Sequence, residues 1–154
     1  MLKGIDPLLT PELLKLLCEM GHGDEIVLAD ANFTAESLAQ AGSARPVLRL
    51  SGVGMQAACR AVLSVFPLDR HVAQPVAYMQ VGDTPQGYRS GLQRSVLSQL
   101  EPDGEEPAVQ GEAMERFAFY DRARRAYAVV QTGEMQAWAN FIFKKGVIAD
   151  ELRP

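Results

Sequence analysis

The stretch Glu19-Met-Gly-His-Gly-Asp-Glu-Ile-Val-Leu-Ala-Asp30 decides how the rest of the chain is interpreted. The aliphatic run at residues 26–28 is too short for a helix and is typical of a strand that is covered on both faces. We expect Gly21 to end the preceding helix in the left-handed conformation, and Gly23 to let the backbone bend again. The pattern therefore places His22 on a short turn and Asp30 at the carboxyl end of a strand, where ligands collect in open α/β sheets.

Length and composition limit the classes of protein. With 154 residues, the chain is predicted to form one domain over residues 1–154. The net charge of −4 gives no sign of a nucleic-acid surface. No run approaches the ~18 apolar residues of a membrane span, and no signal peptide is visible. These features favour a cytoplasmic protein that binds neither nucleic acid nor membrane.

The two cysteines, Cys18 and Cys59, both fall on apolar faces of predicted helices. We expect two buried thiols in a reducing compartment, and a disulfide between them is the alternative. With only two cysteines and two histidines, the sequence contains no zinc-binding motif.

Apolar periodicity predicts alternating helices and strands. Helices are predicted at residues 11–20, 35–40, 55–66, 85–100 and 117–126, and strands at 26–30, 45–50, 75–81, 127–131 and 139–144, with residues 109–116 ambiguous. This alternation predicts a three-layer α/β/α sandwich with a mainly parallel sheet. The acidic, proline-containing segment 101–107 is predicted to be an exposed loop inserted within the domain.

Several polar residues are candidates for chemistry. His22 is the first, because imidazole titrates near neutral pH and can give and take a proton, although a capping or surface role is the plainer interpretation. Asp30 is either a turn carboxylate or an acceptor for adjacent sugar hydroxyls. His22 with Asp24 and Glu25 could also form a metal site, but further ligands are missing. Trp138 and Asn140 suit stacking on a sugar ring and hydrogen bonding to it.

The chain resembles the RbsD/FucU family, which contains L-fucose mutarotases and D-ribose pyranases. The resemblance covers nearly the whole chain and is weakest between Gly42 and Gly111. It rests on the segments Met1-Leu-Lys-Gly-Ile-Asp-Pro-Leu-Leu, Pro11-Glu-Leu-Leu-Lys, Glu19-Met-Gly-His-Gly-Asp-Glu-Ile, Asp30-Ala-Asn-Phe, Arg116-Phe-Ala-Phe-Tyr120, Thr132-Gly-Glu134, Ala139-Asn140 and Lys144-Lys-Gly-Val147.

The resemblance implies a role for each matching position. His22 falls at the family's general acid, and Asp30 at a sugar-binding carboxylate. Arg116 falls where the fucose branch is basic and the ribose branch has histidine. Trp138-Ala139-Asn140 falls on a sugar-binding segment that carries tyrosine where this chain has tryptophan. Tyr120 is an alternative source of the phenol.

The implied activity is mutarotation, the interconversion of the α and β anomers of L-fucose or a related monosaccharide by general acid/base ring opening. This chemistry requires no metal and no organic cofactor. The alternatives are a D-ribose pyranase-type activity, a non-enzymatic monosaccharide-binding module, and a structural α/β domain. The family also implies a ring-like homo-oligomer, often a decamer, with sites at subunit boundaries.

Overall fold

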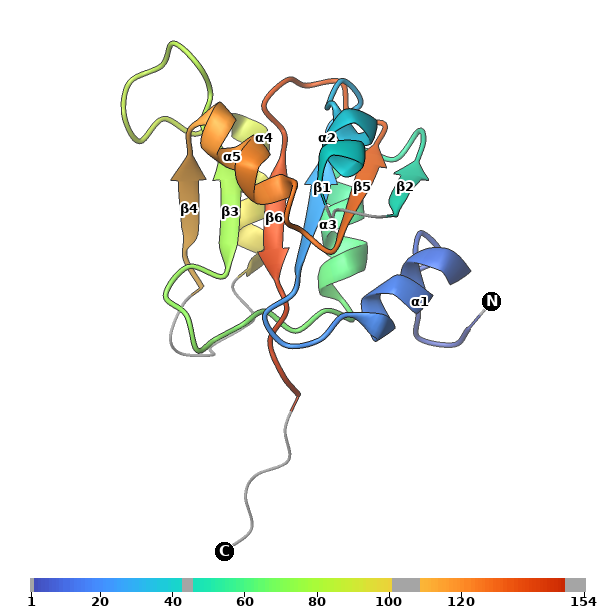
Figure 1. The fold of residues 1–154 in the computed structure, drawn as a ribbon. Coiled ribbons are helices and arrows are strands. Elements are labelled where there is room, and N and C mark those ends of the chain that lie inside the picture. Colours follow the sequence, from blue (N-terminus) through green and yellow to red (C-terminus); the bar gives the residue numbers. More distant parts are fainter. Residues whose placement is uncertain (1, 43–45, 101–108, 149–154) are drawn as a thin grey trace, which may run out of the picture.

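The computed structural model of the chain describes residues 2–42, 46–100 and 109–148. Its centre is a six-stranded sheet in the order β2-β5-β1-β6-β3-β4 (Figure 1). All strand pairs are parallel except those of β6, which runs antiparallel to β1 and β3. The strands are β1 (Glu25–Ala29), β2 (Val47–Leu50), β3 (Val76–Met79), β4 (Gly111–Met114), β5 (Ala128–Thr132) and β6 (Phe141–Lys144).

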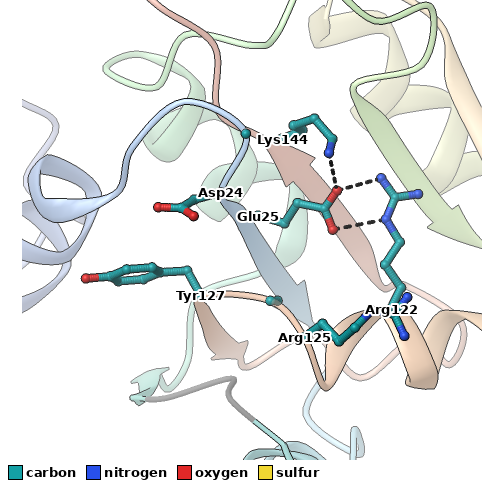
Figure 2. A pocket seen from close by; sticks show the side chains of 8 residues that line it. Asp24, Glu25, Arg122, Arg125, Tyr127 and Lys144 are labelled. Carbon is teal, nitrogen blue, oxygen red and sulfur yellow. Dashed lines mark hydrogen bonds and ion pairs between the residues drawn. The ribbon is translucent and has the colours of Figure 1, made fainter.

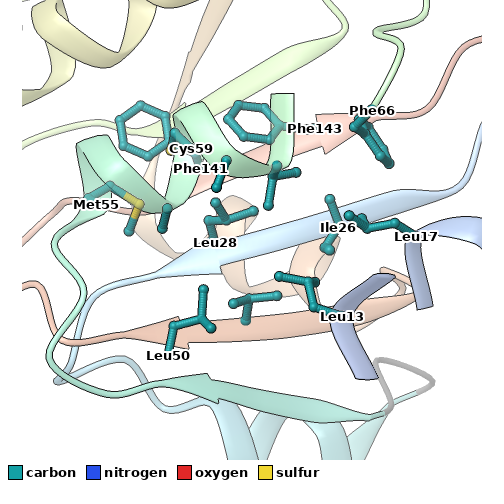
Figure 3. Close-up of a cluster of buried hydrophobic side chains, with 14 of the residues drawn as sticks. Leu13, Leu17, Ile26, Leu28, Leu50, Met55, Cys59, Phe66, Phe141 and Phe143 are labelled. Carbon is teal, nitrogen blue, oxygen red and sulfur yellow. The ribbon is translucent and has the colours of Figure 1, made fainter. Parts of the chain in front are cut away.

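Helices cover both faces of this sheet, which confirms the predicted three-layer architecture. Helices α1 (Pro11–Glu19), α3 (Met55–Leu63) and α4 (Gly91–Leu97) pack on one face, with the 3-10 turn η1 (Ser98–Leu100) after α4. Helices α2 (Ala35–Ala41) and α5 (Arg116–Ala123) pack on the other. Figure 3 shows the first of these cores, where Leu13, Met55 and Cys59 meet strand residues Ile26 and Leu28.

Alternation along β1 explains why its apolar run is continuous. Ile26 and Leu28 point into the first core, whereas Val27 and Ala29 point into the second, and all four are fully buried. A strand that is covered on both faces needs apolar side chains at every position. The strand predicted from residues 26–28 is therefore confirmed.

The turn before β1 is held in place by backbone hydrogen bonds, but its glycines differ from the prediction. Helix α1 ends at Glu19, and Gly23, not Gly21, takes positive φ (86°). Gly23 N donates to Lys145 O and Lys145 N donates to Asp24 O, both at 2.8 Å. Because these bonds tie the turn to the end of β6, His22 has a fixed backbone position.

Helix α4 begins later than predicted. Thr84-Pro85 fits a helix start, but the structure places a turn there, and the helix starts at Gly91. Ser90 and Gln93 form a capping box, with Gln93 N donating to Ser90 Oγ at 3.1 Å and Ser90 N donating to Gln93 Oε1 at 3.0 Å. Tyr88, expected on the apolar stripe, is 45% exposed. The reciprocal side-chain cap satisfies two backbone donors and sets the start of the helix.

The remaining differences are small. Helix α3 ends at Leu63, before the predicted stop at Pro67. Cys18 is exposed and Cys59 is buried, and both are free thiols, so the expectation of two buried thiols is wrong for Cys18. The ambiguous segment 109–116 contains β4. The predicted loop 101–107 and the first residue of the predicted strand 45–50 lie outside the described residues. No helix among those that are described is long and apolar enough to cross a membrane.

Candidate active site

Asp30 and Asn140 lie together where β1 ends and β6 begins. Asn140 Nδ2 donates to Asp30 Oδ2 at 2.8 Å, and the backbone N–H of Asp30 donates to Asn140 Oδ1 at 2.9 Å. Asn32 N donates to the other carboxylate oxygen, Oδ1, at 2.9 Å. These bonds orient the amide and the carboxylate as a pair at the carboxyl edge of the parallel strands.

The surroundings of Asp30 act on its ionisation. The residue is 4% exposed. Burial raises the pKa of the Asp30 carboxyl above its usual value, and the nearby Glu134 carboxylate adds to this, although the hydrogen bonds from Asn140 and the backbone oppose it. Glu134 is itself held in place, since its backbone oxygen accepts from Ala31 N at 2.8 Å and its Oε2 accepts from Met55 N at 3.2 Å.

Trp138 and Arg116 line one cavity at the same edge. The cavity measures about 380 Å³ and its walls include Gln80 and Gly82. Trp138 has positive φ (67°), and its indole covers Gly82 so closely that a Cβ there would lie 2.9 Å from Cζ2. The Arg116 guanidinium lies over the Phe117 ring, 4.6 Å from its centroid. An aromatic ring and a cation thus border the same cavity.

Tyr120 and Ala139 complete the set of predicted residues at this edge. The Tyr120 ring packs against Phe33, with centroids 5.6 Å apart, in the loop that follows Asp30. Ala139 is fully buried between Trp138 and Asn140. The structure therefore brings Asp30, Asn140, Trp138, Arg116 and Tyr120 to one edge of the sheet from three segments of the chain: the end of β1, helix α5 and the residues before β6.

Two buried glutamines that sequence reasoning did not select support this edge. Gln93 Nε2 donates to Met79 O at 2.8 Å and to Trp138 O at 3.2 Å. Gln131 Nε2 donates to Ala31 O at 3.0 Å and to Phe33 O at 2.9 Å. They fix the turn that carries Trp138 and the loop after Asp30. The Ser90-x-x-Gln93 spacing was a usable signal for the first, whereas Gln131 lies within a strand and had none.

His22 lies at the other end of the sheet. Its Nε2 is 3.2 Å from Asp69 Oδ2, and its ring meets His71 edge-on with centroids 6.0 Å apart. Figure 1 shows the turn between α1 and β1 at the amino end of the strand, opposite the loops that follow β1, β3 and β5. The five residues of β1 lie between His22 and Asp30, and at about 3.3 Å per residue the strand alone separates them by roughly 17 Å. One chain does not bring these two residues together.

A second cavity, about 780 Å³ in volume, lies beside the His22 turn. Figure 2 shows Glu25 at this cavity, paired with Arg122 and Lys144. Arg122 Nε donates to Glu25 Oε2 at 3.0 Å and Arg122 Nη2 donates to Oε1 at 2.9 Å, while Lys144 Nζ lies 3.0 Å from Oε1. Burial alone would raise the pKa of Glu25, but the hydrogen bonds and charges of Arg122 and Lys144 outweigh it and hold the pKa below its usual value. This network anchors α5 to β1 and β6.

The metal alternative for His22, Asp24 and Glu25 finds no support in their geometry. The Asp24 carboxylate accepts from Gly21 N at 2.7 Å, the Glu25 carboxylate is paired with Arg122, and His22 faces Asp69. Within residues 2–42, 46–100 and 109–148, no group of three or more His, Cys, Asp or Glu side chains is placed to hold a metal ion. The three side chains point to three different partners.

The fold and the carboxyl edge define an α/β protein that presents carboxylate, amide, guanidinium and indole groups at one end of its sheet, a set of groups able to hydrogen-bond and stack with a small polar ligand. Comparison with known proteins narrows this class. The family model described as "RbsD / FucU transport protein family" matches residues 3–148, and the chain belongs to this family.

Named relatives align over almost the whole chain. This chain is 46% identical over 149 residues to the L-fucose mutarotase of Actinobacillus pleuropneumoniae serotype 5b (strain L20), and the alignment covers 96% of this chain and 97% of the relative. It is 45% identical over 150 residues to the fucose mutarotase of Homo sapiens, covering 96% and 95%. The structure of the fucose mutarotase from Streptococcus pneumoniae in complex with L-fucose superposes with a TM-score of 0.83 at 36% identity, covering 96% of this chain and all of that one (100%).

Proposed function

We propose that this protein is an isomerase, a mutarotase that interconverts the α and β anomers of L-fucose. The observation that carries this proposal is the gathering of Asp30, Asn140, Arg116 and Trp138 at one edge of the sheet, within a chain whose relatives are named fucose mutarotases. The complex of a similar protein with L-fucose supports a monosaccharide as the ligand.

Each group at the edge has a binding task. The Asp30 carboxylate accepts hydrogen bonds from sugar hydroxyls, and Asn140 holds it in position through the 2.8 Å bond to Oδ2. Arg116 donates to ring or hydroxyl oxygens, and the Trp138 face stacks on the apolar face of the pyranose. The raised pKa of Asp30 reflects its burial, and hydrogen bonds from a sugar would favour the ionised form.

His22 is the proposed general acid. Ring opening breaks the C1–O5 bond, with a proton delivered to O5 while the anomeric hydroxyl loses one, and the aldehyde recloses after rotation about C1–C2. A positioned acid or base accelerates such a step by typically ~10²–10⁴-fold. Because an indole N–H cannot accept a hydrogen bond, Trp138 cannot take the hydrogen of the anomeric hydroxyl. The Tyr120 phenol, which lies at the same edge, can accept a hydrogen bond from that hydroxyl, and we assign the removal of its proton to water.

This assignment requires two copies of the chain. His22 and Asp30 are separated by the length of β1 within one chain, so His22 must approach a given sugar from a neighbouring subunit. We therefore propose a cytoplasmic homo-oligomer, a decamer by analogy with the family, in which the amino end of one sheet faces the carboxyl edge of another. Both ends carry exposed apolar side chains suited to such a contact: Phe117 and Met135 at the carboxyl edge, Val72 and Val147 near His71.

Exchange NMR on the anomeric protons of L-fucose tests the function. The wild-type protein should accelerate exchange above the buffer rate, and His22→Ala should lose that acceleration while still binding the sugar. A rate that rises for D-ribose and not for L-fucose would instead identify a pyranase-type activity. Saturable binding of L-fucose without any acceleration would identify a non-enzymatic binding module.

A further inference from the structure

Asp69 is a buried carboxylate that faces the half-exposed ring of His22. Its side chain is 4% exposed, against 48% for that of His22, and Oδ2 lies 3.2 Å from His22 Nε2. Asp69 belongs to the segment between α3 and β3, far from His22 in sequence, and none of the candidate groups selected from the sequence includes it. A buried carboxylate is costly unless hydrogen-bonding or charged partners compensate for its burial. One partner of Asp69 is the ring of His22, the proposed general acid.

The position of Asp69 is fixed from several sides. Its other oxygen, Oδ1, accepts from His71 N at 3.0 Å, and its own backbone N–H donates to Lys144 O at 3.1 Å. Leu68 forms a bridge with Lys145, the residue whose backbone also holds the His22 turn through Gly23. The carboxylate and the histidine turn are therefore both tied to the end of β6, which sets their mutual geometry.

The charge state of Asp69 follows from these contacts. Burial by itself would raise the pKa of the Asp69 carboxyl, but the hydrogen bonds from His71 N and from His22 prevail and hold the pKa below its usual value. At neutral pH the group is a carboxylate, which accepts hydrogen bonds and donates none. Whatever faces it must therefore carry the hydrogen.

We propose that Asp69 is the positioning residue for His22: it fixes the ring and keeps the hydrogen on Nε2, so that Nδ1 is the nitrogen that exchanges the proton with the sugar. This inference rests on the proposed function for its catalytic meaning. In a neutral imidazole one nitrogen donates and the other accepts. A carboxylate on Nε2 selects the tautomer, as it does in catalytic triads through the other nitrogen.

Nitrogen-15 NMR tests the tautomer without any reference to activity. In the wild-type protein, long-range ¹H–¹⁵N spectra at alkaline pH should show the neutral His22 ring with its hydrogen on Nε2. The chain has only two histidines, so His22→Ala identifies the signals. A wild-type ring with its hydrogen on Nδ1 would overturn the proposal, and this result needs no variant of Asp69.

Asp69→Asn then tests the consequence. An amide both donates and accepts, so it no longer selects one tautomer, and the Nδ1–H form should appear in the spectrum. If Asp69 acts through His22, the kcat of L-fucose anomer exchange should fall by about 10–10³-fold with a much smaller change in KM. Asp121→Asn, at an exposed carboxylate on α5 that pairs with Arg124, is the matched control and should change neither readout.

The outcomes separate the two proposals. An Asp69→Asn variant that folds, and that keeps both the Nε2–H tautomer and the wild-type kcat, would overturn the positioning role while leaving the mutarotase standing. A wild-type protein that does not accelerate anomer exchange would refute the mutarotase, and the tautomer spectra would still decide whether Asp69 fixes the His22 ring.

Discussion

His22 and Asp30 flank the same strand, β1, but lie at its opposite ends. His22 precedes Glu25, where the strand begins, and Asp30 follows Ala29, where it ends. The Asp69 carboxylate contacts the His22 ring, and the Asn140 amide donates a hydrogen bond to the Asp30 carboxylate. Under the proposed function, the proton donor and the sugar-binding carboxylate of one chain lie at opposite ends of its sheet, so we expect a complete site to form only between two copies of the chain.

The two glycines beside His22 should respond differently to alanine. Gly23 has φ of +86°, a conformation that costs an L-residue about 1–2 kcal/mol, so Gly23→Ala should lower the free energy of unfolding by about that amount. Gly21 has no positive φ, and a Cβ there would lie 3.7 Å from Asp24 Oδ2, an ordinary contact. Gly21→Ala should therefore stay within ~0.5 kcal/mol of the wild type. Urea denaturation of both variants measures the difference, and equal losses would contradict it.

Gly82 should control the position of Trp138. A Cβ at residue 82 would lie 2.9 Å from Trp138 Cζ2, and a rigid indole must shift to admit it. Gly82→Ala should weaken L-fucose binding by about 5–30-fold, equivalent to about 1–2 kcal/mol. Trp138 is the only tryptophan in the chain, so its fluorescence reports both its surroundings and the titration with sugar.

Gly91 offers the control for this substitution. A Cβ there would come no nearer than 3.9 Å to Arg94 Nη2, so Gly91→Ala should keep the wild-type emission and the wild-type affinity. An unchanged affinity in Gly82→Ala would show that the indole does not contact the sugar.

The Glu25 network predicts a defined dependence of stability on pH. The pKa of Glu25 is lower in the folded chain than in the unfolded chain, so the unfolded state binds more protons in acid. The stability that Glu25 contributes is therefore complete above the unfolded pKa of ~4.3 and disappears as the pH falls through the folded value. Glu25→Gln should be about 1–3 kcal/mol less stable than the wild type at pH 7.

The difference between Glu25→Gln and the wild type should narrow below about pH 4, because protonation neutralises the wild-type carboxylate as well. Chemical denaturation at pH 7 and pH 3.5 gives both values. Glu19→Gln is the control: Glu19 pairs with Lys15 on the surface, with side chains 50% and 75% exposed, and the substitution should cost less than ~0.5 kcal/mol. A difference for Glu25→Gln that grows in acid would contradict the assigned direction of the pKa.

Much of the fold is predictable from the sequence because local patterns determine it. The apolar steps of α1 and α3 and the continuous run of β1 bury the residues that periodicity indicates. The start of α4 is not decided locally, since Thr84-Pro85 and Ser90 with Gln93 both fit helix starts, and the capping box forms at the second. Which of the two glycines beside His22 takes positive φ is also not decided locally. Gly23 does so where its N–H donates to Lys145 O, a contact between residues far apart in the sequence.

The candidate site divides in the same way. Asp30 and Asn140 are grouped only through the family resemblance, because their contact depends on β6 running antiparallel to β1, which the expected mainly parallel sheet does not specify. The contact between His22 and Asp69 depends on how the segment before β3 crosses the end of β6. The spacing of residues in the sequence does not predict this crossing. Residues brought together by topology alone are the ones that sequence reasoning missed.

Mixing two inactive variants tests the shared site most directly. His22→Ala and Asp30→Asn should each fold, assemble and fail to accelerate L-fucose anomer exchange. When equal amounts are refolded together, a site has an even chance of receiving each intact residue, so roughly a quarter of the wild-type rate should return if the residues come from different subunits. Mixed oligomers that form and remain inactive, or a His22→Ala protein that keeps the full rate by itself, would contradict a mutarotase site built from the two ends of neighbouring sheets.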